Sequence, residues 1–172
     1  MTDFPSLWAA ALPYHDFVAG SAVEHRALWE GLYKINTPSE PVLGLRLPAG
    51  SRLLALAADW CGDAVNTLPA IARWAEATGV ELRVLERDSW PEVMDRYLTN
   101  GSRSIPIVIV LDADFHELAH WGPRPSELQE WVLVNKPTME KTERQKYVRR
   151  WYAKDKGATS IRDIVDLVSG KR

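Results

Sequence analysis

The stretch Leu53–Glu76 constrains the fold most strongly, because it holds the only cysteine of the chain where an apolar run gives way to a helical pattern. Residues Leu53–Ala58 form a continuous apolar run of strand length, which predicts a buried strand. Beyond Cys61 the apolar residues recur at steps of three and four, which predicts a helix. Free N–H groups and the positive dipole end at a helix start favour an anion. The sequence therefore predicts that the Cys61 thiolate is stabilised over the thiol.

Two motifs together resemble a thioredoxin. They are Trp60-Cys61-Gly62-Asp63, with Pro69 in the following helix, and Ser104-Ile105-Pro106-Ile107 before an apolar strand. The resemblance covers about Arg52 to Asn135. It implies an α/β protein with a thioredoxin-like fold, in which helices flank a mixed central β-sheet.

The resemblance also implies roles for individual residues. Cys61 takes the place of the cysteine that attacks disulfides, Trp60 flanks it, and Pro69 kinks the active-site helix. An X–Pro bond is trans by default, but the resemblance implies a cis Ile105–Pro106 peptide facing the sulfur. The expected substrate-binding residues are Trp60, Gly62, Asp63, Ala64, Ile105 and Pro106.

Two positions depart from the thioredoxin pattern. Thioredoxins carry a second cysteine three residues after the first, but this chain has Ala64 there, so it has no resolving thiol. The buried carboxylate that thioredoxins place six residues before the nucleophile is replaced by Ala55. Ordinary dithiol exchange is therefore not expected of this chain.

The chain length of 172 residues predicts a single domain with extensions. We expect a mainly helical N-terminal extension over residues 1–50, a thioredoxin-like core over 52–135 and a helical, basic C-terminal extension over 136–172. The net charge of −2 gives no reason to expect nucleic acid as a partner. No apolar run approaches the ~20 residues that span a bilayer, so no membrane partner is expected. The amino terminus lacks the basic start of a secretory signal, which favours a cytoplasmic location.

Periodicity and turn residues place the remaining elements. Ser21-Ala22-Val23-Glu24 has the spacing of a capping box, followed by an expected apolar helix face of Val23, Ala27, Leu28 and Leu32. The other expected helices are Ser6–Leu12, Trp90–Leu98, Ser126–Val134, Met139–Ala153 and Ser160–Val168. The other expected strands are Val42–Leu47, Val80–Glu86, Ile105–Leu111 and its hairpin partner Glu117–Trp121.

Several side chains have both a functional and a structural interpretation. Asp63 is either a base beside the sulfur or an ordinary first-turn residue. Its charge would raise the thiol pKa, in opposition to the helix start, so the sequence leaves the sign of the net pKa shift open. Arg103 could hold a substrate carboxylate or lie solvated in a loop. His116 and His120 have a metal spacing only within a helix, and we expect turn and strand there, so no metal is predicted. The basic tail with Trp151 and Tyr152 either contacts nucleic acid or packs its aromatic side on the protein.

The main functional hypothesis is a thiol-disulfide oxidoreductase that works through Cys61 alone. It forms a mixed disulfide with a protein disulfide or a low-molecular-weight thiol, and an external thiol releases it. No cofactor is implied, and the oligomeric state stays open. The alternative is a binding module in which the fold is a scaffold for a protein partner and Cys61 is inert. A third possibility is peroxide sensing through a sulfenic acid at Cys61.

Overall fold

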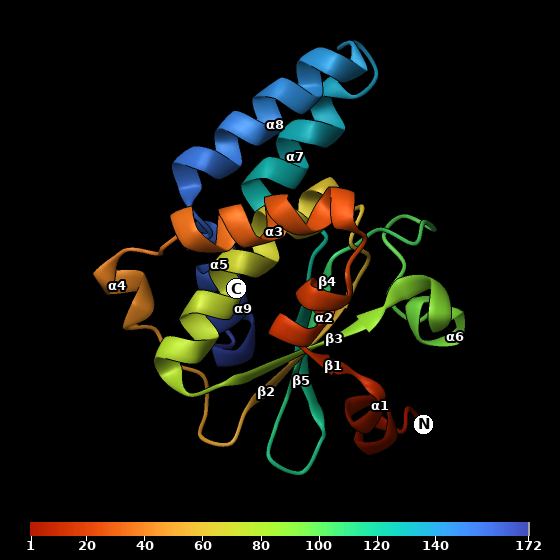
Figure 1. Cartoon of the computed structure of the whole chain (residues 1–172), viewed down its shortest axis with the longest axis vertical. Helices are drawn as coiled ribbons and strands as arrows, with labels where there is room; N and C mark the ends of the chain where they lie inside the picture. The colour runs from red at the N-terminus through yellow and green to blue at the C-terminus, as the bar shows by residue number, and fades with distance from the viewer. Residues whose placement is uncertain (172) are drawn as a thin grey trace.

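The computed structural model describes residues 1–171, and a five-stranded mixed sheet forms the centre of this part of the chain (Figure 1). The strands are β1 (Leu12–Pro13), β2 (Arg52–Ala57), β3 (Glu81–Glu86), β4 (Ile107–Leu111) and β5 (Glu117–Trp121), in the order β1-β3-β2-β4-β5. Strands β2 and β3 pair in parallel, whereas β1–β3, β2–β4 and β4–β5 are antiparallel. The predicted α/β class and mixed sheet are confirmed.

Helices precede, flank and follow this sheet. They are α1 (Phe4–Ala10), α2 (Tyr14–Gly20), α3 (Val23–Ile35), α4 (Glu40–Leu43), α5 (Gly62–Thr78), α6 (Pro91–Met94), α7 (Ser126–Asn135), α8 (Lys141–Asp155) and α9 (Ala158–Ser169), with a 3₁₀ turn at Arg87–Ser89. The predicted helical extensions at both ends are present. Helices α7 and α8 form a hairpin that projects away from the sheet (Figure 1).

The core follows from the two apolar runs of the sequence. Residues 53–57 of β2 and 107–111 of β4 are each at most 2% exposed, so both faces of these central strands are covered. Helix α5 buries Leu68, Ile71 and Trp74 completely, and α3 packs against α5. Trp29 of α3 is fully buried beside the Tyr14 and Phe17 rings of α2. Strand β2 ends at Ala57 and α5 begins at Gly62. The short connection that ends at Cys61 is therefore held between two buried elements.

The strand predicted at Val42–Leu47 is wrong. The structure has helix α4 at Glu40–Leu43, followed by irregular chain. Pro41 lies in the first turn of α4, a position that suits proline because its fixed φ is already helical. The irregular chain is held by the Trp74 indole, which donates a 3.0 Å hydrogen bond to the Leu45 carbonyl.

The capping box predicted at Ser21 is also wrong. The N-cap of α3 is Ala22, whose N–H donates to the Asp59 carboxylate at 2.8 Å, while the Ser21 hydroxyl donates to the Phe17 carbonyl. The predicted apolar face is wrong for Val23 and Leu28, which are 78% and 55% exposed, whereas Leu32 packs against the core. Burial of Trp29 sets the orientation of α3, and its indole donates a 2.8 Å hydrogen bond to the Asp59 carbonyl.

The other predicted elements differ less from the structure. The strand over Val80–Glu86 and the hairpin strand Glu117–Trp121 are confirmed, and the strand expected at Ile105–Leu111 begins only at Ile107. The helix expected at Trp90–Leu98 is regular only over Pro91–Met94. Helix α2, at Tyr14–Gly20, was not predicted.

Candidate active site

Cys61 is the N-cap residue of α5, in an extended conformation (φ −79°, ψ 118°) that ends the connection from β2. Its backbone N–H bonds the Ala58 carbonyl at 3.1 Å, which closes a tight turn between strand and helix. The Sγ thiol lies 3.4 Å from the carbonyl oxygen of Ile105, to which it donates. The residue is 8% exposed, so the sulfur lies in a nearly closed place beyond the end of the central strand β2.

The peptide facing the sulfur is the Ile105–Pro106 bond, which is cis as the resemblance implied. A second cis bond, Gly122–Pro123, lies behind it. Gly122 has φ 125°, and a Cβ there would come within 2.1 Å of the Pro106 carbonyl oxygen. Only glycine therefore allows these two segments to pack this closely. Their contact directs the chain after Gly122 toward the start of α5.

The pKa of the Cys61 thiol is raised above its ordinary value. Burial is the main cause, because the charged thiolate loses its hydration, and the negative charge of Asp63 adds to the rise. The backbone N–H groups of Ala64 and Asp63 and the positive charge of Arg124 act in the opposite direction but do not outweigh burial. The predicted stabilisation by the helix start is therefore present, yet the thiol form is favoured at neutral pH.

Asp63 is held by two groups from distant parts of the chain. The Arg124 guanidinium bonds both carboxylate oxygens, with Nε at 3.0 Å from Oδ1 and a terminal nitrogen at 2.8 Å from Oδ2. The Tyr152 hydroxyl donates to Oδ1 at 2.9 Å, and Arg124 also donates to the Gln129 side chain. This network joins the start of α5 to α7 and α8. With both oxygens engaged, Asp63 is a structural anchor in this state and not a free base.

The comparison with known families decides what kind of protein holds this site. A model of the thioredoxin family, described as "Thioredoxin", matches residues 12–145. The chain belongs to the thioredoxin family. The match extends well beyond the Arg52–Asn135 region of the resemblance, so most of the N-terminal helical segment lies within it.

Solved structures share this thioredoxin fold. A protein of unknown function from Pseudomonas aeruginosa matches with a TM-score of 0.79 at 18% identity, over 100% of both chains. An HIV epitope-scaffold matches with a TM-score of 0.75 at 19% identity, over 98% of this chain and 99% of the scaffold. At these identities the likeness concerns the fold alone. A comparison with curated proteins found no significant match.

The remaining thioredoxin-like positions lie around the sulfur in different environments. Trp60 is 52% exposed, and the Arg87 guanidinium lies over its ring at 4.8 Å. The Gly62 carbonyl accepts a 2.7 Å hydrogen bond from the Asn66 side chain, inside the first turn of α5. Ala64, where a thioredoxin has its second cysteine, is completely buried. Pro69 lies inside α5 and is also buried.

Ala55 is fully buried in the sheet, paired with Val84 and Val108. Apolar strands thus surround the position where thioredoxins carry an acid. Ala55 has no ionisable side chain that could accept the Cys61 proton.

The other candidate residues lie outside this arrangement. Arg103 is bound by Asp95 through two hydrogen bonds of 2.7 and 2.8 Å, so its guanidinium is engaged in a local ion pair. His116 contacts Asp112, and His120 contacts Glu117. Within residues 1–171, no group of three or more potential metal ligands is found. No helix in the same range is long and apolar enough to cross a membrane.

Sequence reasoning missed Arg124 and the bond from Tyr152 to Asp63. The two residues lie 61 and 89 positions from Asp63, and no local periodicity connects residues so far apart. The only available signal for Arg124 was its place between two prolines, in Gly122-Pro123-Arg124-Pro125, where the backbone is unusually restricted. The interpretation that the aromatic side of the C-terminal segment packs on the protein is confirmed for Tyr152, which is 2% exposed.

Proposed function

We propose that this protein catalyses thiol-disulfide exchange through the single thiol of Cys61. The observation that carries the proposal is the place of the sulfur at the start of α5, 3.4 Å from the carbonyl of the cis Ile105–Pro106 peptide. The backbone N–H groups of Asp63 and Ala64 favour the thiolate from the other side. A helix start supplies the charge stabilisation that a leaving or attacking thiolate needs.

The exchange has two steps, each of which replaces one S–S bond by another. The Cys61 thiol first loses its proton to solvent, and the thiolate attacks one sulfur of a disulfide. The substrate S–S bond breaks, a mixed disulfide with Cys61 forms, and the other half leaves as a thiolate. An external thiolate then attacks the mixed disulfide and releases the Cys61 thiolate, because Ala64 provides no second thiol. The external thiol ends in a disulfide with the second half of the substrate, the first half has left as a thiolate, and the Cys61 thiolate is regenerated.

The substrate class is a disulfide, either in an extended segment of a protein or in the oxidised form of a low-molecular-weight thiol. The backbone of Ile105 beside Pro106 can pair with an extended segment by strand addition. The exposed ring of Trp60 and the first turn at Gly62–Ala64 would bound the opposite side of the substrate. Because burial raises the thiol pKa, the attack should quicken as the pH rises through the alkaline range.

The test is the capture of a mixed disulfide. Protein incubated with oxidised glutathione should gain the mass of one glutathione on Cys61, and added thiol should remove it. Cys61→Ser should give no adduct, and Ala64→Cys should gain dithiol reductase activity against a model disulfide. If intact-mass analysis finds no adduct on the folded parent protein between pH 7 and 9, the proposed exchange is wrong.

A second function, a binding module with an inert cysteine, is favoured by a specific observation. Cys61 is only 8% exposed and its pKa is raised, so at neutral pH the sulfur is both covered and protonated. Alkylation by iodoacetamide across pH 5–9 separates the two functions. The raised pKa by itself lowers the thiolate fraction, so the rate is compared per thiolate. A rate per thiolate well below that of a free cysteine favours the scaffold, whereas one that reaches or exceeds the free value favours exchange.

A further inference from the structure

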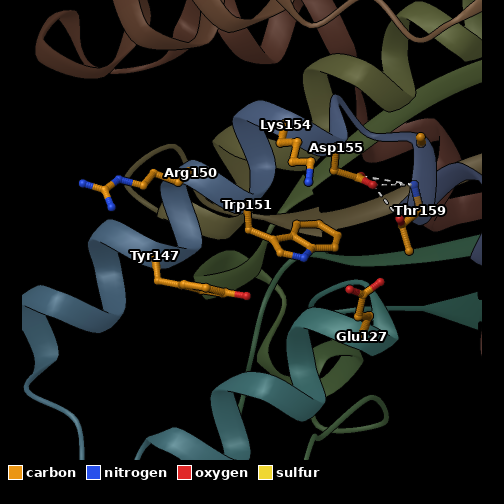
Figure 2. Close-up of a pocket in the computed structure, with 8 residues that line it drawn as sticks. Glu127, Tyr147, Arg150, Trp151, Lys154, Asp155 and Thr159 are labelled. Atoms are coloured by element: carbon orange, nitrogen blue, oxygen red, sulfur yellow. Dashed lines mark hydrogen bonds between the residues drawn. The ribbon is translucent and has the colours of Figure 1, made fainter.

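A groove between α7 and α8 lies apart from the Cys61 site, on the projecting hairpin. A cavity of about 670 Å³ opens between α8, the beginning of α7 and the beginning of α9 (Figure 2). A smaller cavity of about 280 Å³ adjoins it farther along α7. The two cavities share Glu127, Tyr147 and Trp151, so they form one continuous groove.

Three aromatic side chains line the smaller cavity. The rings of Trp131 and Tyr147 stack across the hairpin with centroids 3.7 Å apart and an interplanar angle of 10°. Trp151 is half-buried beside them, and in Figure 2 its indole extends from α8 into the space above Glu127. The indole N–H of Trp151 has no hydrogen-bond acceptor among residues 1–171. This arrangement presents a rigid aromatic surface that a ligand can reach.

Some acidic side chains of the groove form hydrogen bonds within the described part of the chain and others do not. Asp155 accepts hydrogen bonds from the backbone and hydroxyl of Thr159, so it caps the start of α9. Glu127 and Glu130, one turn apart on α7, form no ion pair or hydrogen bond through their side chains within residues 1–171. Figure 2 shows the Glu127 carboxylate directed toward Trp151. The smaller cavity thus has two free carboxylates beside three rings, and no cationic side chain lines it.

We propose that this groove binds an arginine side chain of a partner protein, with the guanidinium against the Trp151 ring and paired with Glu127. A cation over a tryptophan face is attracted by the ring quadrupole. A guanidinium suits this place better than an ammonium, since it is planar, stacks on aromatic rings and bonds a carboxylate through two parallel N–H groups.

The position of the bound guanidinium follows from the remaining charges. Lys154 lines the larger cavity, and its ammonium points toward Trp151 from the side opposite Glu127 (Figure 2). It repels a cation from that end. Arg150 also lines this cavity, but its guanidinium points away from the ring in Figure 2. The arginine is therefore held at the Glu127 and Glu130 end of the groove.

The test uses the indole N–H signal of Trp151 in ¹⁵N-labelled full-length protein, assigned by its loss in Trp151→Phe. The probes are an acetylated, amidated pentapeptide with one arginine among glycines and its twin with neutral citrulline in that place. We expect a saturable shift with the arginine peptide and binding about tenfold weaker with citrulline, which corresponds to about 1.4 kcal/mol. Salt at 0.5 M should weaken the arginine peptide further.

Glu127→Gln supplies the decisive variant and Glu24→Gln the matched control. Both residues are exposed, so neither change should disturb folding, and Glu24 lies on α3 outside the groove. Glu127→Gln should weaken the arginine peptide about tenfold, and Glu24→Gln should leave it unchanged. Equal binding of the citrulline peptide, or a Trp151 shift caused by inorganic phosphate and not by arginine, would overturn the proposal. Cys61 takes no part in this test, so its outcome is independent of the exchange chemistry.

Discussion

Two carboxylates of this protein differ sharply in their surroundings, although each lies in the first turn of a helix. Asp63, in α5, has a side chain that is 16% exposed and is bonded by Arg124 and Tyr152. Glu127, in α7, is exposed beside aromatic rings and has no partner within residues 1–171. An engaged, half-buried carboxylate contributes to stability and is costly to disturb, whereas a free one contributes little to stability and is available to a ligand.

The largest expected effect is on the free energy of unfolding. Arg124→Ala leaves the Asp63 carboxylate partly buried without its cation, which should cost about 2–3 kcal/mol. Glu127→Ala should change the stability by no more than about 0.5 kcal/mol, as is usual for an exposed residue without partners. Urea denaturation of both variants measures the difference. Equal losses for the two would show that the Asp63 network does not hold the helices together.

The next effect concerns the pH dependence of stability. The folded protein keeps the Cys61 proton above the ordinary thiol pKa of 9.0, whereas the unfolded chain loses it. The folded state then binds more protons, so stability falls as the pH rises above about 9, by at most about 1.4 kcal/mol per pH unit.

Cys61→Ala removes this contribution and supplies the control. The stability of the parent protein relative to Cys61→Ala should decline between pH 8.5 and 10, as measured by urea denaturation. A difference that stays constant over this range would mean that burial does not raise the thiol pKa. The buried tyrosines are present in both proteins and cancel in the comparison.

Tyr152→Phe tests the link between α8 and the start of α5. The change removes only the hydroxyl that donates to Asp63 at 2.9 Å and keeps the buried ring. We expect a loss of about 1 kcal/mol, the usual net value of such a hydrogen bond. Tyr147→Phe is the matched control, because the Tyr147 hydroxyl has no partner within residues 1–171. If thermal unfolding shifts equally in both variants, the bond to Asp63 contributes nothing specific.

The smallest expected effect is on the reactivity of the sulfur. Asp63→Asn removes a negative charge that raises the thiol pKa, so the thiolate fraction and the alkylation rate at pH 8 should rise about threefold. Arg124→Gln should lower the rate, because it removes a positive charge that acts in the opposite direction. Iodoacetamide kinetics on folded protein measure both. Changes of the same sign in the two variants would indicate an altered exposure of Cys61 and not an altered charge.

Local sequence patterns predict the elements whose own residues are apolar enough to show that they are buried. The apolar runs of β2 and β4 and the periodic apolar residues of α5 need no information from distant residues, because a continuous apolar run predicts a buried strand and steps of three and four predict a helix. The spacing of Val23 and Leu28 predicts the wrong buried face of α3, because the fully buried Trp29 lies outside that face. The apolar residues of Val42–Leu47 predict a strand, because they do not reveal the bond from Trp74 to Leu45.

The sequence by itself determined that a buried strand delivers Cys61 to a helix start, that a resolving cysteine is missing, and that a thioredoxin-like fold surrounds both. Only the tertiary structure decided that Asp63 is paired with Arg124 and Tyr152, that the thiol pKa is raised, and that free carboxylates and aromatic rings meet in the hairpin groove. The physical reason is that burial and charge act through space. Residues far apart in the chain supply both, and the order of residues along the chain does not record which of them become neighbours.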